Sequence, residues 1–275
     1  MSNFFSSNNV NSHCFDITVV GGGLTGSLMV YLLLSSKIIS KSKICWIKPE
    51  EKKIHDDRVS FYNFKNFEKL LERGFLNNLS CNEITQIKEI HVLNEKQQKP
   101  LIWKHPNSMG YIIKNKIVQK KLLKNVKNVK IFNSFVIKSI SDEFNRTVTL
   151  EDGTVISSNL IIAADGNNSK LRNISSIKYF SHKLNHVAIT GYLELNNTNQ
   201  NIARQAFLKE GPIGLLPVGS KQNYLNYVWS IKENFADKIL KQKNCSLIIS
   251  NKLNKFYKRH NLIFSPVKDL TKKNL

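Results

Sequence analysis

The amino-acid sequence predicts an α/β protein, and three observations carry that prediction. An apolar, β-branched segment over Phe15–Val20 runs directly into a glycine-rich turn, which an apolar helix follows. A second apolar segment ends in the polar turn Asp165-Gly166. After Ile177 the chain changes to short strands separated by turns, which is typical of an antiparallel sheet. With 275 residues the chain has room for one large domain or two smaller ones.

The turn after the first strand reads GGGLTG and fits the G-x-G-x-x-G pattern of dinucleotide-binding loops. Gly21 permits the tight turn, Gly23 lets the backbone approach a pyrophosphate, and Gly26 lets the helix pack on the strand. The helix expected over Ser27–Leu34 begins with free N–H groups that favour an anion. A purely structural turn is the alternative. The residues expected at the phosphates are Gly21, Gly23, Leu24, Thr25 and Gly26.

The second strand, over Lys43–Ile47, completes a βαβ unit about 20 residues beyond the loop. Such a strand commonly ends in an acidic residue that binds the ribose hydroxyls. Lys48 occupies that position here, and Glu50 follows two residues later. Either the strand continues and Glu50 binds the ribose, or the ribose contact is lost. A 2′-phosphate beside Lys48 is a third interpretation, although Arg is the usual partner of that group.

The remaining elements follow from apolar spacing and turn residues. A helix is expected over 64–74, β structure over 89–93, and a strand leading into an amphipathic helix over 110–126. Strands are expected over 130–140 and 147–156, the latter with a hairpin turn at Asp152-Gly153. The later strands read HVAITGYLEL, ARQAFL, GPIGLLPV and NYLNYVWSI, and the segment over 236–260 is expected to be helical.

The chain is strongly basic, with a formal net charge of +21. Such a charge raises the possibility of nucleic acid or an anionic membrane as a partner. The lysines are dispersed, however, and clusters such as Lys120-Lys121 are short. We therefore interpret the charge as a general surface property. No nucleic-acid partner is expected, and a weak association with an anionic membrane surface remains.

The sequence contains no pattern of metal ligands. The cysteines are scattered, which is typical of reduced thiols in a cytoplasmic protein; they are Cys14, Cys45, Cys81 and Cys245. His182 and His186 lack an acidic third ligand. No apolar run has the length of a transmembrane helix. We expect no metal site.

The chain resembles the class A FAD-dependent aromatic hydroxylases, and within them the ubiquinone-biosynthesis hydroxylase family, from about Phe15 to Ser230. The motifs that carry the resemblance are VVGGGLTGS, DDRVS at Asp56–Ser60, GYIIKN at Gly110–Asn115, ADGNNSKLR, and FLKEGPIGLLPV at Phe207–Val218. The resemblance implies a FAD-binding Rossmann-like domain of the glutathione-reductase type, with an inserted antiparallel β-sheet substrate domain.

The resemblance also implies roles for matched positions. The glycine loop would hold the FAD pyrophosphate, and Arg58 would lie over the cofactor. Asp165 and Gly166 would lie near the pyrophosphate, with Arg172 holding their turn. An ordinary turn-forming Asp and a surface Arg are the alternatives at Asp165 and Arg58.

The activity that the resemblance implies is NAD(P)H-dependent hydroxylation of a polyprenylated phenol. The flavin carries the oxidative chemistry, so no side chain is assigned a catalytic role. Other ubiquinone-biosynthesis proteins would be partners. The expected location is the cytoplasm, or peripherally the inner membrane.

Four segments are expected in order. Residues 1–14 form a disordered N-terminus; 15–176 a FAD-binding domain with a β insertion around 80–110; 177–232 the antiparallel substrate-side sheet; and 233–275 a helical segment. Nothing after Ser230 matches the family's further Gly-Asp motif near the flavin ring. The alternatives are a fragment or frameshifted product, or a degenerate flavin-binding protein without hydroxylase activity. A basic nucleic-acid-binding protein is a weaker alternative.

Overall fold

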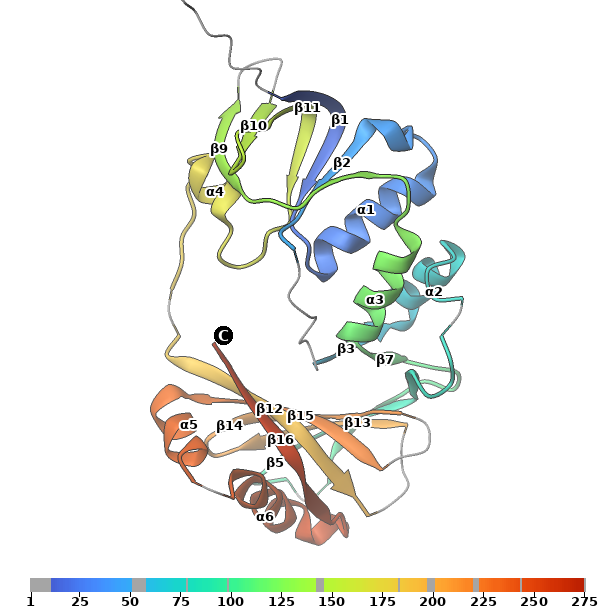
Figure 1. Cartoon of the computed structure of the whole chain (residues 1–275). Helices are drawn as coiled ribbons and strands as arrows, with labels where there is room; N and C mark the ends of the chain where they lie inside the picture. The colour runs from blue at the N-terminus through green and yellow to red at the C-terminus, as the bar shows by residue number, and fades with distance from the viewer. Residues whose placement is uncertain are drawn as a thin grey trace, which may run out of the picture. The chain divides into compact units, whose positions relative to one another are not determined.

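The computed structural model describes residues 11–50, 58–77, 79–97, 99–141, 146–182, 184–196, 201–219, 223–242 and 244–274. The chain divides into two compact units (Figure 1). Unit 1 comprises Met1–His55 and Val118–Phe180, and unit 2 comprises Asp56–Ile117 and Ser181–Leu275. The domain boundaries expected from the sequence stay predictions.

Unit 1 contains a six-stranded sheet. In spatial order its strands are β8 (Lys130–Phe132), β2 (Ile44–Ile47), β1 (Ser12–Val20), β11 (Val155–Ala163), β10 (Arg146–Leu150) and β9 (Val136–Ser141). The first four are parallel to one another, and β10 and β9 add an antiparallel extension. The β10–β11 hairpin turns at Asp152-Gly153 as expected, since Gly153 has φ +83° and the Asp152 carboxylate accepts from Thr154 N–H at 3.0 Å.

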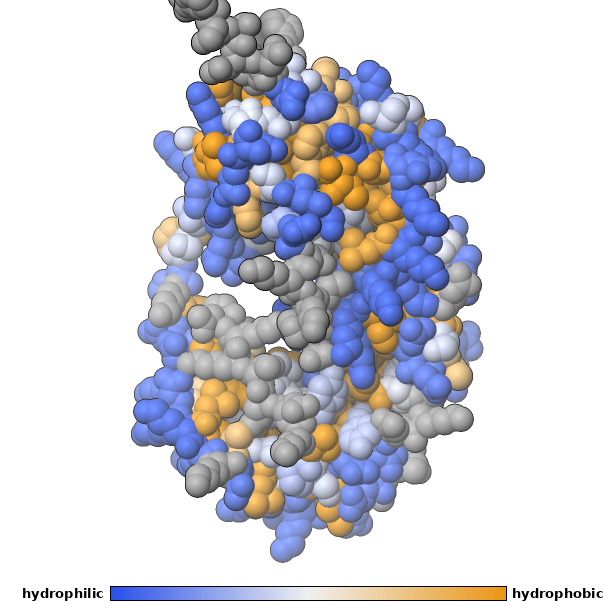
Figure 2. All heavy atoms as spheres, in the orientation of Figure 1, coloured by the Kyte–Doolittle hydropathy of each residue, from blue (hydrophilic) through white to orange (hydrophobic). Residues whose placement is uncertain are grey.

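The central strands of unit 1 are apolar because both faces of a parallel sheet are covered. All four residues of β2 are buried. One core cluster joins β1 and β2 to the helices α1 (Leu24–Ser36) and α3 (Asn115–Asn125), through residues such as Val19, Val30, Trp46 and Leu123. Figure 2 shows apolar side chains gathered over α1, whereas hydrophilic side chains cover much of the visible surface. The remaining short helices of unit 1 are η1 (Lys41–Lys43) and α4 (Lys170–Ile174).

Unit 2 contains a seven-stranded sheet. In spatial order its strands are β16 (Phe264–Asn274), β12 (His186–Leu195), β15 (Tyr224–Lys232), β14 (Gly211–Pro217), β13 (Ile202–Leu208), β5 (Glu89–Asn94) and β6 (Leu101–Lys104). A separate three-stranded sheet has the order β3 (Val59–Asn63), β7 (Gly110–Lys114) and β4 (Ile84–Ile87). The helices are α2 (Phe64–Glu72), α5 (Glu233–Leu240), α6 (Cys245–Tyr257) and the short η2 (Lys258–His260).

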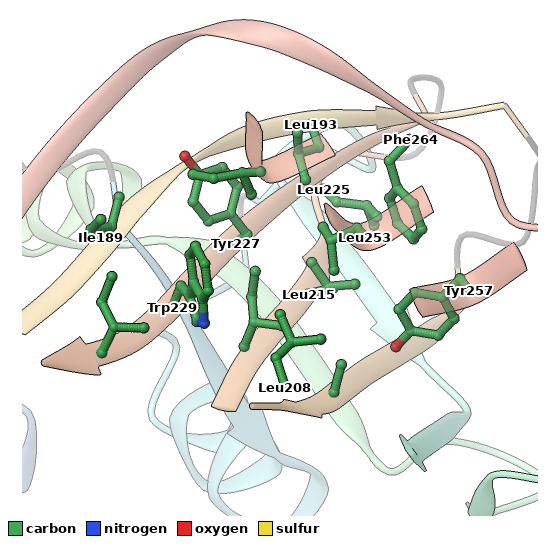
Figure 3. Close-up of a cluster of buried hydrophobic side chains, with 14 of the residues drawn as sticks. Ile189, Leu193, Leu208, Leu215, Leu225, Tyr227, Trp229, Leu253, Tyr257 and Phe264 are labelled. Atoms are coloured by element: carbon green, nitrogen blue, oxygen red, sulfur yellow. The ribbon is translucent and has the colours of Figure 1, made fainter. Parts of the chain in front are cut away.

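Alternating residues of the large sheet form the core of unit 2. Tyr227 and Trp229 of β15 are fully buried and pack with Leu253 and Tyr257 of α6 (Figure 3). The indole N–H of Trp229 donates to the Gly211 carbonyl oxygen at 3.1 Å, so this large side chain is buried without an unpaired donor. Helices α5 and α6 therefore cover one face of the large sheet.

Three expectations from the sequence are corrected. Residues 12–14 are not disordered but belong to β1, because β11 is long enough to pair with them, as Ser12 with Val155; residues 1–10 lie outside the described residues. The helical segment over 233–275 holds only as far as His260, since 264–274 form β16 on the free edge of β12. The large sheet is also not wholly antiparallel, because β5 pairs parallel to β13.

Candidate nucleotide-binding site

The glycine loop between β1 and α1 is held against the ends of two neighbouring strands. Gly21 N–H donates to the Ile47 carbonyl oxygen at 2.8 Å, and Gly21 has φ +126°. A Cβ atom at Gly21 would overlap the carbonyl oxygen of Ala164, and one at Gly26 would overlap that of Gly21. Both glycines are therefore required by close backbone packing, as the sequence predicted.

Gly23 differs from its neighbours. It is the N-cap of α1, with φ −71° and ψ −175°, and no side chain caps the helix there. A Cβ atom at Gly23 would meet nothing within 4 Å. Gly23 and Thr25 are exposed and Leu24 is half-buried. The start of α1 thus offers an approach to the backbone, where N–H groups and the helix dipole attract an anion.

Side chains from outside the loop bind its carbonyl groups. Trp46 Nε1–H donates to the Gly21 oxygen at 2.8 Å, and Gln119 Nε2–H donates to the Gly22 oxygen at 3.1 Å. Ser27 Oγ–H donates to the Gly23 oxygen at 2.9 Å. These three hydrogen bonds fix the orientation of the successive carbonyl groups of Gly21, Gly22 and Gly23. Trp46, Gln119 and Ser27 were not predicted as members of this site. All three side chains carry a hydrogen-bond donor, and a donor that is buried requires an acceptor, which was the only signal that the sequence offered.

The end of β11 lies beside the same loop. Ala164 N–H donates to the Val20 oxygen at 2.7 Å, and Asp165 follows directly. The Asp165 carboxylate accepts from Ser169 Oγ–H at 2.5 Å and from Leu171 N–H at 3.1 Å. Asp165 therefore binds the start of α4 and holds the turn that contains Gly166. Gly166 is exposed, has φ +90°, and has open space where a Cβ would lie.

Arg172 stabilises this turn from the other end. Its guanidinium donates to the Asn167 carbonyl oxygen at 3.0 Å and stacks over the Tyr179 ring at 3.9 Å. Its backbone N–H donates to Ser169 Oγ at 3.0 Å, so Ser169 caps α4. The structure thus brings together the loop and the Asp165-Gly166 turn, which are the two motifs expected at one ligand.

Lys48 and Glu50 follow β2 and are the two residues considered for a contact with the ribose. Lys48 N–H donates to the Phe132 oxygen at 3.0 Å, and its ammonium lies 5.2 Å from the Trp46 ring centroid. The side chain of Lys48 is therefore engaged in a cation–π contact. Glu50 is exposed, three residues beyond the end of β2. Its predicted contact with a ribose stays a prediction.

Arg58 belongs to unit 2 and is exposed. Its carbonyl oxygen accepts from Asn115 N–H at 2.9 Å. Ser60 Oγ–H donates to Asn115 Oδ1 at 2.6 Å, while β3 and β7 pair antiparallel. Two motifs of the predicted resemblance, DDRVS and GYIIKN, are therefore neighbours in space. Asp56 and Asp57 lie outside the described residues.

The histidines singled out from the sequence make no cluster. His186 begins β12 and its Nδ1 hydrogen-bonds the Leu184 carbonyl oxygen at 2.7 Å. Across the residues that the structure describes, no group of three or more His, Cys, Asp or Glu side chains could hold a metal ion. Within the same residues no helix is long and apolar enough to cross a membrane.

The fold is similar to that of solved flavin-dependent monooxygenases. The structure superposes on pqsL, a probable FAD-dependent monooxygenase from Pseudomonas aeruginosa, with a TM-score of 0.71 and 14% identity, over 93% of this chain and 73% of that one. It also superposes on p-nitrophenol 4-monooxygenase PnpA from Pseudomonas putida DLL-E4, with a TM-score of 0.68 and 13% identity, over 97% of this chain and 69% of that one.

In sequence the chain is similar to the mitochondrial ubiquinone biosynthesis monooxygenase COQ6. It is 26% identical to that of Drosophila melanogaster over 245 residues, which cover 82% of this chain and 51% of that protein. It is 28% identical to that of Dictyostelium discoideum over 270 residues, covering 82% and 54%. These similarities confirm the predicted resemblance. The chain spans about half the length of the curated relatives it matches. No protein-family model matches it.

Proposed function

We propose that this protein is a FAD-dependent monooxygenase of ubiquinone biosynthesis that hydroxylates a polyprenylated phenol. The observation that carries the proposal is the open backbone at Gly23, at the uncapped start of α1 and beside the Asp165 turn. Two strand ends thereby present one surface suited to a phosphate-bearing cofactor. The sequence similarity to ubiquinone biosynthesis monooxygenases supports the reaction class.

The residues present fit FAD. The backbone from Gly23 to Gly26 would hold the pyrophosphate. Gly23 leaves free the space that the phosphate would occupy, whereas a residue with a Cβ would fill it. The Asp165-Gly166 turn would support the same cofactor from β11, and Glu50 would bind the ribose. Arg58 would lie over the cofactor and contribute positive charge. When bound, FAD supplies the redox chemistry, with NAD(P)H as the electron donor and dioxygen as the oxygen source.

The large sheet of unit 2 is the proposed substrate domain. Only β5 and β6 come from the segment between the two parts of unit 1, and the other five strands follow the second part. One face of this sheet packs on α5 and α6 through Tyr227 and Trp229. The alternating residues of β15, among them Asn226 and Val228, point to the other face. We assign the phenol ring to that second face. The protein's part in catalysis would be to orient the ring and keep water away.

A polyprenyl chain is apolar and would lie in a membrane, so the protein would bind this substrate at the membrane surface. The net charge of +21 would favour peripheral association with anionic lipid. Other ubiquinone-biosynthesis proteins are the proposed protein partners.

The test uses the purified chain titrated with FAD, followed by incubation with NADPH and a short-chain prenylphenol. Flavin absorption in the protein fraction reports binding, and mass spectrometry reports a product heavier by one oxygen atom. We expect both signals, and neither for a Gly23→Val variant that remains folded. A folded chain that binds no FAD would contradict the cofactor assignment. FAD binding without hydroxylated product would contradict the reaction for this chain and favour a flavin-binding role.

A further inference from the structure

A pocket of about 240 Å³ lies within unit 2, apart from the glycine loop. It is formed between β5 and β13 and the end of α6 with η2. Its apolar wall includes Leu93, Ile202 and Leu262, and its polar groups include His91, Arg204 and Tyr257. An engineered cavity of about 150 Å³ binds benzene, so this volume suffices for a molecule with one aromatic ring.

Arg204 is the unusual member of this pocket. Arg204 is only 5% exposed. Its side chain points to the same face of β13 as the core residues Ala206 and Leu208. Among the described residues its guanidinium makes a single hydrogen bond, from Nη1 to the Ile202 carbonyl oxygen at 3.2 Å. A guanidinium carries five N–H donors, so most of this group's donor capacity is unused. Burial lowers the pKa of Arg204, which reflects a charge removed from water.

No carboxylate in the described part of the chain forms an ion pair with Arg204. Glu89 lies on the same sheet face, because Glu89 and His91 of β5 pair with Ile202 and Arg204 of β13. The Glu89 carboxylate is taken up by other partners, His91 Nε2 at 2.7 Å and Lys104 Nζ at 3.3 Å. A buried cation with no direct counter-ion is costly, and a bound anion would remove that cost.

We propose that this pocket binds a small organic monoanion, of the class of monocyclic aromatic carboxylates, with the carboxylate on Arg204 and the ring against Leu93 and Leu262. The planar guanidinium fork matches a carboxylate in a bidentate arrangement. The negative charge of Glu89 nearby disfavours a dianion such as a phosphate monoester. The apolar wall disfavours a small hydrated ion. The Tyr257 hydroxyl, whose pKa burial raises to about 12, remains a neutral donor beside the site.

The inference does not rest on the proposed function. The pocket belongs to unit 2 alone, on the sheet face that α6 covers, whereas the phenol is assigned to the opposite face. A ligand here would therefore act as an effector or a stabiliser and would not compete directly with the phenol.

The test compares benzoate with benzamide, its neutral analogue of the same shape, by isothermal titration calorimetry and thermal unfolding of the full chain. Benzoate is expected to bind saturably at one site and to raise the unfolding temperature, with benzamide weaker by at least about tenfold. An Arg204→Met variant should lose benzoate binding. Arg259→Met removes an exposed cation from η2 and should bind benzoate as the unaltered chain does.

A Leu262→Trp variant provides an independent check if Arg204→Met fails to fold, because the indole would fill the pocket while Arg204 remains. It too should lose benzoate binding. Equal binding of benzoate and benzamide, or benzoate affinity unchanged in Arg204→Met or Leu262→Trp, would overturn the proposal. So would the absence of saturable benzoate binding by the folded chain. Loss of binding in Arg259→Met alone would show general surface electrostatics and would also overturn it.

Discussion

The indole N–H of Trp46 in β2 donates a 2.8 Å hydrogen bond to the carbonyl oxygen of Gly21, the first residue of the glycine loop. Trp46 is 1% exposed, so neither group has access to water. The same loop residue donates its N–H to Ile47, the last residue of β2. One strand therefore holds both polar groups of Gly21. This links the packing of the parallel sheet to the orientation of the loop.

Replacing Trp46 by Phe should weaken both the fold and cofactor binding. The Gly21 carbonyl would lose its buried donor, which costs about 1–3 kcal/mol of unfolding free energy, and the loop would be less rigid. Denaturant unfolding and FAD titration measure the two effects. Trp229→Phe is the matched control, because it removes an equivalent bond to Gly211 in unit 2. It should lower stability similarly and leave FAD affinity unchanged; equal loss of affinity in both variants would contradict the role of Trp46.

Replacing Gly21 by Ala should destabilise the protein severely. The added Cβ would overlap the Ala164 carbonyl oxygen at a φ of +126°, so the strand end must move. We expect a loss of more than about 2 kcal/mol. Gly153→Ala is the control, since φ there is +83° but the Cβ would meet nothing within 4 Å. It should cost only about 1 kcal/mol, from backbone strain. Similar melting temperatures for the two variants would show that the close approach at Gly21 is unimportant.

Replacing Asp165 by Ala should loosen the second motif. Ser169 Oγ and Leu171 N–H would lose their acceptor, at a cost of about 1–3 kcal/mol in stability, and FAD affinity should fall because the Gly166 turn is no longer held. Asp165→Asn retains an oxygen that accepts from Leu171 and should recover most of both losses. Thermal unfolding and FAD titration of the two variants check this. An Ala variant as stable as the unaltered chain would refute the positioning role.

The buried thiol of Cys45 should resist alkylation in the folded state. Burial raises the pKa of Cys45 to about 12, so the reactive thiolate is scarce near neutral pH. Cys14 and Cys81 are exposed and should react first with iodoacetamide, as peptide mass spectrometry would record. Because the folded pKa lies above the ordinary value of about 8.5, the free energy of unfolding should fall as pH rises above that value. Rapid labelling of Cys45 under native conditions would contradict this burial.

The loop was predictable because its signal is local. The strand, the three glycines and the helix stand within one short stretch, and each glycine has a steric reason that the sequence pattern already expresses. The hairpin at Asp152-Gly153 was predictable for the same reason, since turn residues act on their neighbours. The strands β12 to β15 followed from alternation and intervening turns.

Contacts between distant residues were not predictable. Trp46 and Gln119 bind loop carbonyls from positions 25 and 97 residues away, and no spacing rule connects them. The strand β16 was missed because its polar sequence gives no β pattern, and the free edge of β12 provides its pairing partners. The burial of Arg204 was missed because a lone Arg in a strand usually lies at the surface.

The central claim is that the backbone at Gly23 receives the FAD pyrophosphate, and a FAD titration of Gly23→Val tests it most directly. Gly23 has φ −71°, ψ −175° and open space at its Cβ, so a β-carbon there requires no change in the backbone. We expect a variant that remains folded and binds no measurable FAD, because the side chain occupies the approach to the helix start. Unchanged FAD affinity in the folded Gly23→Val variant would contradict the claim.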